Sequence, residues 1–209
     1  MSSCLWYYTA PVTRLTTRTL LGYASSMAAI DDLFATRQST PHNINEHMAT
    51  LRHYGRMVDE ITEFGVETGF STTAFLAARP KRLVSYEINR DPRLSVVFDA
   101  APPETEWDFH TLDCLTADVA PCDLLFIDTF HNYRQLKEEL RLHGNKARKF
   151  LIFHDTETFK YCDQTPTSGP QGLVQAIAEF LEANPHWQIR EHFAHQCGLT
   201  ILERENDAG

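Results

Sequence analysis

The chain has 209 residues, the length of one globular domain, and 43% of them are hydrophobic while 22% are charged. This composition excludes a mostly disordered, collagen-like or coiled-coil protein. With 19 Lys plus Arg against 28 Asp plus Glu, the formal net charge is −9. Nucleic acid and anionic membranes bind cationic surfaces, so both are unfavoured partners and a small molecule is the expected one.

The cysteines and the first residues of the chain indicate the cellular compartment in which the protein is expected. The five cysteines form no CxxC pair, so the sequence predicts neither a disulfide framework nor a cysteine zinc site. The start of the chain lacks the basic and apolar regions of a signal peptide, and no apolar run approaches the roughly 18 residues of a membrane helix. These features favour a cytoplasmic protein. Residues 1–24 show no clear period, and a homo-oligomer contact is left open for them.

Helical spacing of apolar residues predicts a helix over residues 27–37 and, after a breaker at 38–43, a second helix capped by Asn43. Together they form a predicted N-terminal helical cap, residues 1–58, ahead of a main domain at 59–205. His47 and Tyr54 in the second helix are interpreted as ordinary helix-surface residues, with a place facing the site as the alternative.

From residue 60 onward, strands alternate with helices. The predicted strands cover 60–66, 82–88, 107–112, 122–128 and 149–155, and the helices cover 69–80, 91–101, 133–144 and 171–185. A final pair at 187–193 and 198–204 reads as an antiparallel hairpin. This order predicts an α/β fold with a doubly wound, mostly parallel sheet and an antiparallel C-terminal strand. In such sheets ligands bind outside the carboxyl ends of the strands.

The first strand ends in a glycine turn with Gly65 and Gly69, which would allow a tight turn and a close approach of ligand. The spacing matches neither GxGxxG nor the phosphate-binding P-loop, and the glycines alone favour an ordinary turn. Glu87 closes the next strand about 20 residues after Gly65, a distance suited to an acid that holds ribose hydroxyls. When the turn and Glu87 are considered together, ligand binding becomes a better interpretation than an ordinary turn.

The later strand tips carry acids and imidazoles. Asp113 follows the third strand, where it could face an adenine amino group or cap a turn. Asp128 and His131 follow the fourth strand, and His154 and Asp155 end the fifth. Converging carboxylates suit Mg²⁺, Ca²⁺ or Mn²⁺, and added imidazole shifts the preference toward a transition metal. A histidine near a hydroxyl could also act as a general base.

Four segments, ITEFGVETGFST, SYEINRD, LDCLTADVAPCDLLFIDTFHNY and FLIFHDTETF, resemble successive motifs of class I S-adenosylmethionine-dependent methyltransferases. Within that class they resemble the branch of cephalosporin-hydroxylase-like proteins and macrolide-sugar O-methyltransferases. The resemblance covers about residues 43–205 and implies a Rossmann-like methyltransferase fold, S-adenosylmethionine as cofactor and a transferase activity. It does not name the acceptor.

The resemblance also implies roles for the residues that match its motifs. The cofactor-binding positions are Glu63, Gly65, Gly69, Ser71, Glu87, Asp113 and Asp128. Two departures stand out: Glu67 lies where many class I enzymes have glycine, and His154 stands where the metal-dependent sugar methyltransferases have glutamate.

Catalysis and metal binding are placed at the D-x-x-H element and the fifth strand tip. The resemblance implies Asp128 and Asp155 as ligands of Mg²⁺ or another divalent cation, with His154 beside them, and His131 with Asp128 as the catalytic pair. The expected reaction is O-methylation of a small-molecule or sugar hydroxyl, and the segment 159–172 is a candidate acceptor-binding flap. Two alternatives stay open: a catalytically inactive S-adenosylmethionine-binding regulatory or partner protein, and a metal-dependent hydrolase or hydroxylase that uses the same histidines and aspartates. A nicotinamide-dependent oxidoreductase is disfavoured because GxGxxG is missing.

Overall fold

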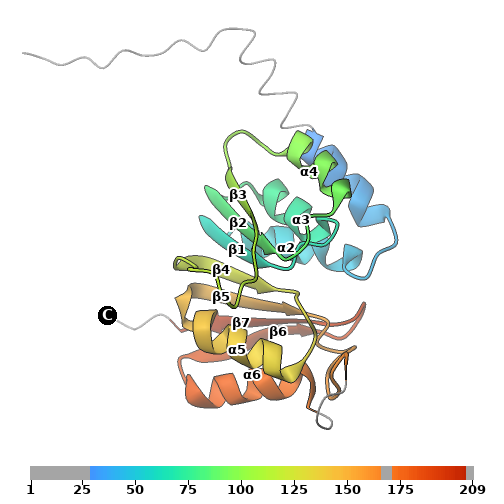
Figure 1. Ribbon diagram of the computed structural model, residues 1–209. Coiled ribbons are helices and arrows are strands. Elements are labelled where there is room, and N and C mark those ends of the chain that lie inside the picture. The colour runs from blue at the N-terminus through green and yellow to red at the C-terminus, as the bar shows by residue number, and fades with distance from the viewer. Residues whose placement is uncertain (1–28, 166–170, 206–209) are drawn as a thin grey trace, which may run out of the picture.

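Seven strands form one sheet in the order β3-β2-β1-β4-β5-β7-β6 in the computed structural model, which describes residues 29–165 and 171–205 (Figure 1). The strands are β1 (Glu60–Phe64), β2 (Arg82–Glu87), β3 (Glu106–Thr111), β4 (Cys122–Ile127), β5 (Ala147–His154), β6 (Trp187–Phe193) and β7 (Leu199–Arg204). The first five run parallel, and β7 is antiparallel to both β5 and β6. The predicted doubly wound sheet is confirmed. The antiparallel strand is inserted between β5 and β6, so β6 forms the outer edge.

Helices cover both faces of the sheet. A helix over 29–39 is followed by α2 (Met48–Gly55), α3 (Phe70–Ala78), α4 (Ser95–Ala100), α5 (Tyr133–His143) and α6 (Gly172–Ala183), and α5 and α6 pack side by side (Figure 1). Short 3₁₀ turns lie at Asn45–His47, Pro92–Leu94 and Gly144–Lys146. Within the described residues, no helix is both long enough and apolar enough to cross a membrane.

The central strands are buried on both faces because their apolar runs are continuous. In β4, Leu124 and Phe126 join the cluster that contains α2 and α3, whereas Leu125 and Ile127 join the cluster that contains α5 and α6. This alternation follows from the two-residue period of a strand. Because both faces of β4 are buried, its residues 124–127 are hydrophobic at every position instead of alternating between apolar and polar residues.

The N-terminal segment differs from its prediction. Asn43 does not cap a helix: the chain first forms the 3₁₀ turn, α2 starts at Met48, and neither element has a side-chain cap. His47 and Tyr54 are each only 1% exposed, so their interpretation as surface residues is wrong. The cause is the β6–β7 hairpin, which packs on them: His47 Nε2 lies 3.0 Å from the Gln196 carbonyl, and Tyr54 accepts a 3.0 Å hydrogen bond from Arg190.

The described part of the predicted cap packs into the main core, with Phe34 and Leu51 in the same apolar cluster as β1 and α3. The division at residue 58 stays a prediction, and residues 1–28 lie outside the described residues.

The strand order reverses at β1, which pairs with β2 on one side and with β4 on the other. Parallel strands on both sides of such a switch leave a crevice at their carboxyl ends, where their connections leave in opposite directions. The glycine turn after β1 and the acids after β2 and β4 lie at this crevice.

Candidate cofactor and active site

The turn after β1 requires glycine at its first position. Gly65 has φ +82°, and a Cβ added there would lie 1.8 Å from the carbonyl oxygen of Asp128. The turn therefore lies directly against Asp128, the residue that follows β4. Gly69 has φ +81° and N-caps α3, which starts at Phe70. Only a residue without Cβ tolerates both the left-handed conformation and this close approach.

Glu63 lies behind this turn. It is fully buried and accepts hydrogen bonds from Ser71 Oγ (2.6 Å), Thr72 Oγ1 (2.8 Å) and Ser85 Oγ (2.7 Å). Burial raises the pKa of Glu63 to about 7, although the three hydroxyl donors oppose the shift. Glu63 thus fixes the first turn of α3, and it adjoins the smaller cavity through Ser71, which lines that cavity.

Glu87 stands at the tip of β2, where its Oε2 accepts hydrogen bonds from the backbone N–H groups of Val66 and Glu67, both at 2.9 Å. It lines a cavity of about 440 Å³ that also contains Asp113. Asp113 accepts a 2.9 Å hydrogen bond from the Leu115 N–H and thereby caps a turn. It also lines the cavity.

Three large apolar side chains around this cavity, Ile88, Leu112 and Phe130, are exposed. A cavity with an acid on one wall and exposed apolar side chains around it suits a flat base attached to a group with hydroxyls.

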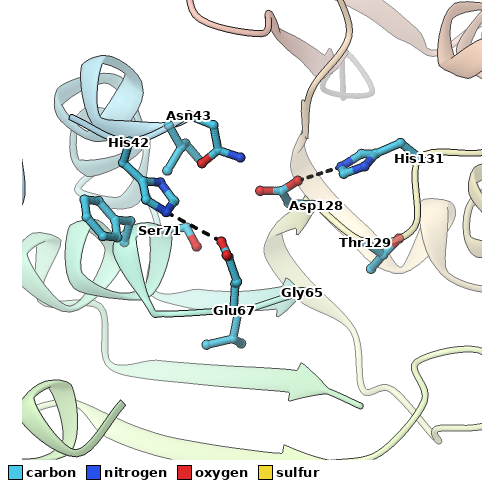
Figure 2. A pocket seen from close by; sticks show the side chains of 11 residues that line it. His42, Asn43, Gly65, Glu67, Ser71, Asp128, Thr129 and His131 are labelled. Atoms are coloured by element: carbon cyan, nitrogen blue, oxygen red, sulfur yellow. Dashed lines mark hydrogen bonds and ion pairs between the residues drawn. The ribbon is translucent and has the colours of Figure 1, made fainter. Parts of the chain in front are cut away.

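A second cavity of about 280 Å³ shares Gly65, Asp128 and Thr129 with the first. Its other polar walls are His42, Asn43, Glu67, Ser71 and His131, and Figure 2 shows Asp128 and His131 facing Ser71 and His42 across it. The two cavities meet at these shared residues, and together they form one extended site with a larger and a smaller arm.

Four predicted residues from two neighbouring strand tips come together beside the second cavity, which Asp128 and His131 line. His131 Nε2 lies 3.1 Å from Asp128 Oδ1 and 2.9 Å from Asp155 Oδ2. His154 Nδ1 lies 3.3 Å from one oxygen of each carboxylate, and that buried nitrogen has no hydrogen-bond partner of good geometry. Asp155 holds a left-handed backbone, with φ +60°, to reach this position.

The charges in this cluster stabilise one another. Burial alone would lower the pKa of His131 and His154, but the two carboxylates beside them raise both. Burial would likewise raise the pKa of Asp128 and Asp155, and the imidazoles lower both. A protonated His131 donates from Nε2, while its Nδ1 lies 2.9 Å from Gln164 Oε1. His131 can therefore act as a base only after it has lost a proton from its ring.

The structure thus places the predicted residues in three positions. Gly65, Ser71, Glu87, Asp113, Asp128 and His131 line the two cavities. Glu63 and Gly69 support the turn from behind, and His154 and Asp155 reach the site through Asp128 and His131. The roles assigned to these residues stay predictions. Of the segment 159–172, residues 166–170 lie outside the described residues.

Sequence reasoning missed Glu139, a fully buried acid on α5. Its Oε1 accepts hydrogen bonds from Thr129 Oγ1 (2.6 Å), Gln135 Nε2 (2.8 Å) and Cys114 Sγ (3.3 Å), and all three donors line the larger cavity. The available signal was its spacing, because Glu139 lies three residues after Leu136 and one before Leu140 on the apolar side of the helix.

Glu139 predicts a pH-dependent stability difference. Burial raises the pKa of Glu139 to about 7 from 4.5, so the folded protein holds a proton that the unfolded chain releases between these values. This group's contribution to stability is therefore present below pH 4.5 and falls as pH rises toward 7. From pH 4.5 to 8, the Glu139→Gln variant is expected to gain up to about 3 kcal/mol relative to wild type in denaturant unfolding. Glu138→Gln, on the exposed side of the same helix, is the control and should show no comparable gain. A difference between Glu139→Gln and wild type that does not change with pH would contradict this.

Several solved structures with similar folds hold S-adenosylmethionine or S-adenosylhomocysteine. The O-methyltransferase from Bacillus cereus, in complex with S-adenosylhomocysteine, has a TM-score of 0.58 at 18% identity, covering 87% of this chain and 91% of its own. The O-methyltransferase TomG from Streptomyces achromogenes, in complex with S-adenosylmethionine, has a TM-score of 0.57 at 18% identity, with 88% and 89% covered. The N-methyltransferase NodS from Bradyrhizobium japonicum, bound to S-adenosylhomocysteine, has a TM-score of 0.56 at 16% identity, with 88% and 98% covered.

No protein-family model matches the chain, and no curated protein matches it. The structural likeness therefore concerns the fold, and it includes neighbours named for methylation at oxygen and at nitrogen. The strand order, the glycine turn after β1 and these neighbours agree: the chain has the Rossmann-like fold of class I S-adenosylmethionine-dependent methyltransferases.

Proposed function

We propose that the protein transfers a methyl group from S-adenosylmethionine to a hydroxyl group of a small molecule. The observation that carries this proposal is the extended site around Gly65: Glu87 lines its larger arm, His131 lines its smaller arm, and Asp128, 3.1 Å from His131, lines both. A long ligand with a base at one end fits such a site, with its base in the larger arm and its reacting end in the smaller arm.

The larger arm supplies groups for the adenosine part of the cofactor. The Glu87 carboxylate can accept hydrogen bonds from two neighbouring ribose hydroxyls, as an acid at this position does in other dinucleotide and nucleoside sites. Ile88 and Leu112 offer apolar surface to the adenine ring, and Asp113 can accept a hydrogen bond from its amino group. The base therefore binds away from the second arm.

The smaller arm supplies groups for the transfer. The acceptor oxygen forms a bond to the methyl carbon, the carbon–sulfur bond breaks, and its electron pair stays on sulfur. The walls of the arm hold the two reactants in line and exclude water, which is the main catalytic contribution in such a displacement. Asp128 orients His131, and once His131 has lost its own proton it can take up the proton that the acceptor hydroxyl loses.

The cluster also fits a divalent cation. Asp128, His131 and Asp155 can each offer one ligand atom, all within 4.8 Å of one another. The Nδ1 of His154, 3.3 Å from both carboxylates, is a fourth candidate ligand atom. Such a cation would lower the pKa of a bound acceptor hydroxyl. Because imidazole nitrogens share the site with carboxylates, the donor set favours a first-row transition ion over Mg²⁺.

The test is transfer of a labelled methyl group from S-adenosylmethionine to a panel of catechols, sugars and amines, first with a chelator and then with Mg²⁺ or Mn²⁺ restored. Label on an acceptor oxygen would support the proposal, and loss with chelator that Mn²⁺ reverses would support the cation. Transfer that the chelator leaves unchanged would contradict the cation and leave His131 as the base. Label found on nitrogen acceptors alone would contradict O-methylation.

A further inference from the structure

Glu139 is a buried acid beside the site, and it has no part in the proposed transfer so far. Its Oε1 accepts three hydrogen bonds, whereas its Oε2 is buried without a hydrogen-bond partner among the residues that the structure describes. Burial raises the pKa of Glu139 to about 7, and the nearby Asp113 carboxylate adds to that rise. At neutral pH an acid in this place therefore makes the fold less stable than an uncharged side chain of the same size would. A destabilising acid of this kind is typical of a residue that serves an active site.

Thr129 connects Glu139 to the open site. Its hydroxyl donates the shortest of the three hydrogen bonds, at 2.6 Å, to Glu139 Oε1. Thr129 directly follows Asp128 in the sequence, and it lines both arms of the site. Figure 2 shows its side chain on the same side of the smaller arm as His131. Because the hydroxyl proton of Thr129 is directed at Glu139, the lone pairs of its oxygen are available to a hydroxyl group bound in the site.

Holding the three donors in place does not require an acid. A glutamine side chain would present a carbonyl oxygen to the same donors, Thr129 Oγ1, Gln135 Nε2 and Cys114 Sγ. What the carboxylate of Glu139 adds is the ability to take up a proton. A group that loses and gains its proton near neutral pH is well suited to this task.

We propose that the proton of the acceptor hydroxyl passes through the Thr129 hydroxyl to the Glu139 carboxylate as the methyl group is transferred. The acceptor gives its proton to the Thr129 oxygen, Thr129 gives its own proton to Glu139 Oε1, and Glu139 becomes a neutral carboxylic acid. The acceptor oxygen keeps the electron pair that forms the bond to the methyl carbon. Between turnovers, Glu139 returns a proton by the same route to water in the emptied site. This inference rests on the proposed function, because it needs a hydroxyl acceptor, and it requires no prior proton loss from His131.

Glu139→Gln distinguishes proton uptake from a structural role. The assay is transfer of a labelled methyl group from S-adenosylmethionine to the catechol or sugar that wild type methylates fastest. The kcat of Glu139→Gln should fall at least about 100-fold, with the KM for S-adenosylmethionine within about two-fold of wild type. Its stability at pH 8 should nevertheless exceed that of wild type, whereas a purely structural role would move rate and stability in the same direction. Glu138→Gln, whose side chain is 43% exposed on the same helix, should transfer as wild type does.

Two variants of Thr129 test the connecting hydroxyl independently of Glu139. Thr129→Val removes the hydroxyl at nearly the same shape, whereas Thr129→Ser keeps it and should transfer at least about ten times faster than Thr129→Val. A Glu139→Gln rate within about three-fold of wild type would overturn the relay, and equal rates in the two Thr129 variants would overturn it even if Glu139→Gln fails to fold. Absence of transfer by wild type to every hydroxyl acceptor would instead overturn the proposed function, and the relay with it.

Discussion

Replacing Asp128 with asparagine is expected to slow methyl transfer at least about 100-fold, the scale of a lost general acid–base group. Asp128 lines both arms of the site and lies within 3.3 Å of a nitrogen of both His131 and His154. Asparagine keeps the shape but removes the charge. Two imidazoles then share the single carboxylate of Asp155, and any cation loses one ligand.

The same change should also destabilise the fold. Removing one partner of a buried charge cluster leaves the remaining charges uncompensated, which costs about 3 kcal/mol in comparable buried pairs. Transfer rates and denaturant unfolding of Asp128→Asn are to be compared with those of Asp99→Asn, an exposed position on α4. A transfer rate within about three-fold of wild type would show that the cluster is not the reacting centre.

The second large effect is expected from Gly65→Ala. The added methyl carbon would lie 1.8 Å from the Asp128 carbonyl oxygen, and this neighbour is backbone tied to the end of β1 by the hydrogen bond from the Asp128 N–H to the Phe64 carbonyl. The φ of +82° adds strain for any residue with a Cβ. We expect a loss of more than about 3 kcal/mol, or failure to fold, because the turn and the tip of β4 cannot both keep their places.

Gly69→Ala is the matched comparison, since Gly69 has nearly the same φ, +81°, but its added carbon would meet side-chain methyl groups of Leu94 and Val97 rather than backbone. Its loss should be smaller, mainly the roughly 1–2 kcal/mol of the left-handed backbone, because side chains can shift where backbone cannot. Unfolding midpoints of the two variants measure the difference. Equal losses would mean that the contact between the turn and Asp128 has no special cost.

The sequence predicted those parts of the site that depend on strand order. Continuous apolar runs marked β4 and β5 as central strands, and the residue after each run was therefore a candidate at the crevice. Glu87, Asp128 and Asp155 reach the site for this reason: parallel strands end at the same edge of a sheet.

Features that depend on contacts between distant segments could not be predicted. Glu63 is enclosed by Ser85 and the first turn of α3, and no local pattern encodes that enclosure. Burial of His47 likewise depends on the β6–β7 hairpin about 150 residues later. The conformation of Glu67 is a property of the folded turn, so its approach to His42 was invisible in the sequence.

Calorimetric titration with S-adenosylhomocysteine tests the central claim most directly, because it needs no knowledge of the acceptor. Wild-type protein should bind with micromolar affinity, and Glu87→Ala should weaken binding at least ten-fold, about 1.4 kcal/mol, since it removes the acceptor for the ribose hydroxyls. Glu106→Ala, on the neighbouring edge strand, should leave the affinity unchanged. Absence of binding by the wild-type protein, with and without a divalent cation, would contradict the assignment of the site to S-adenosylmethionine.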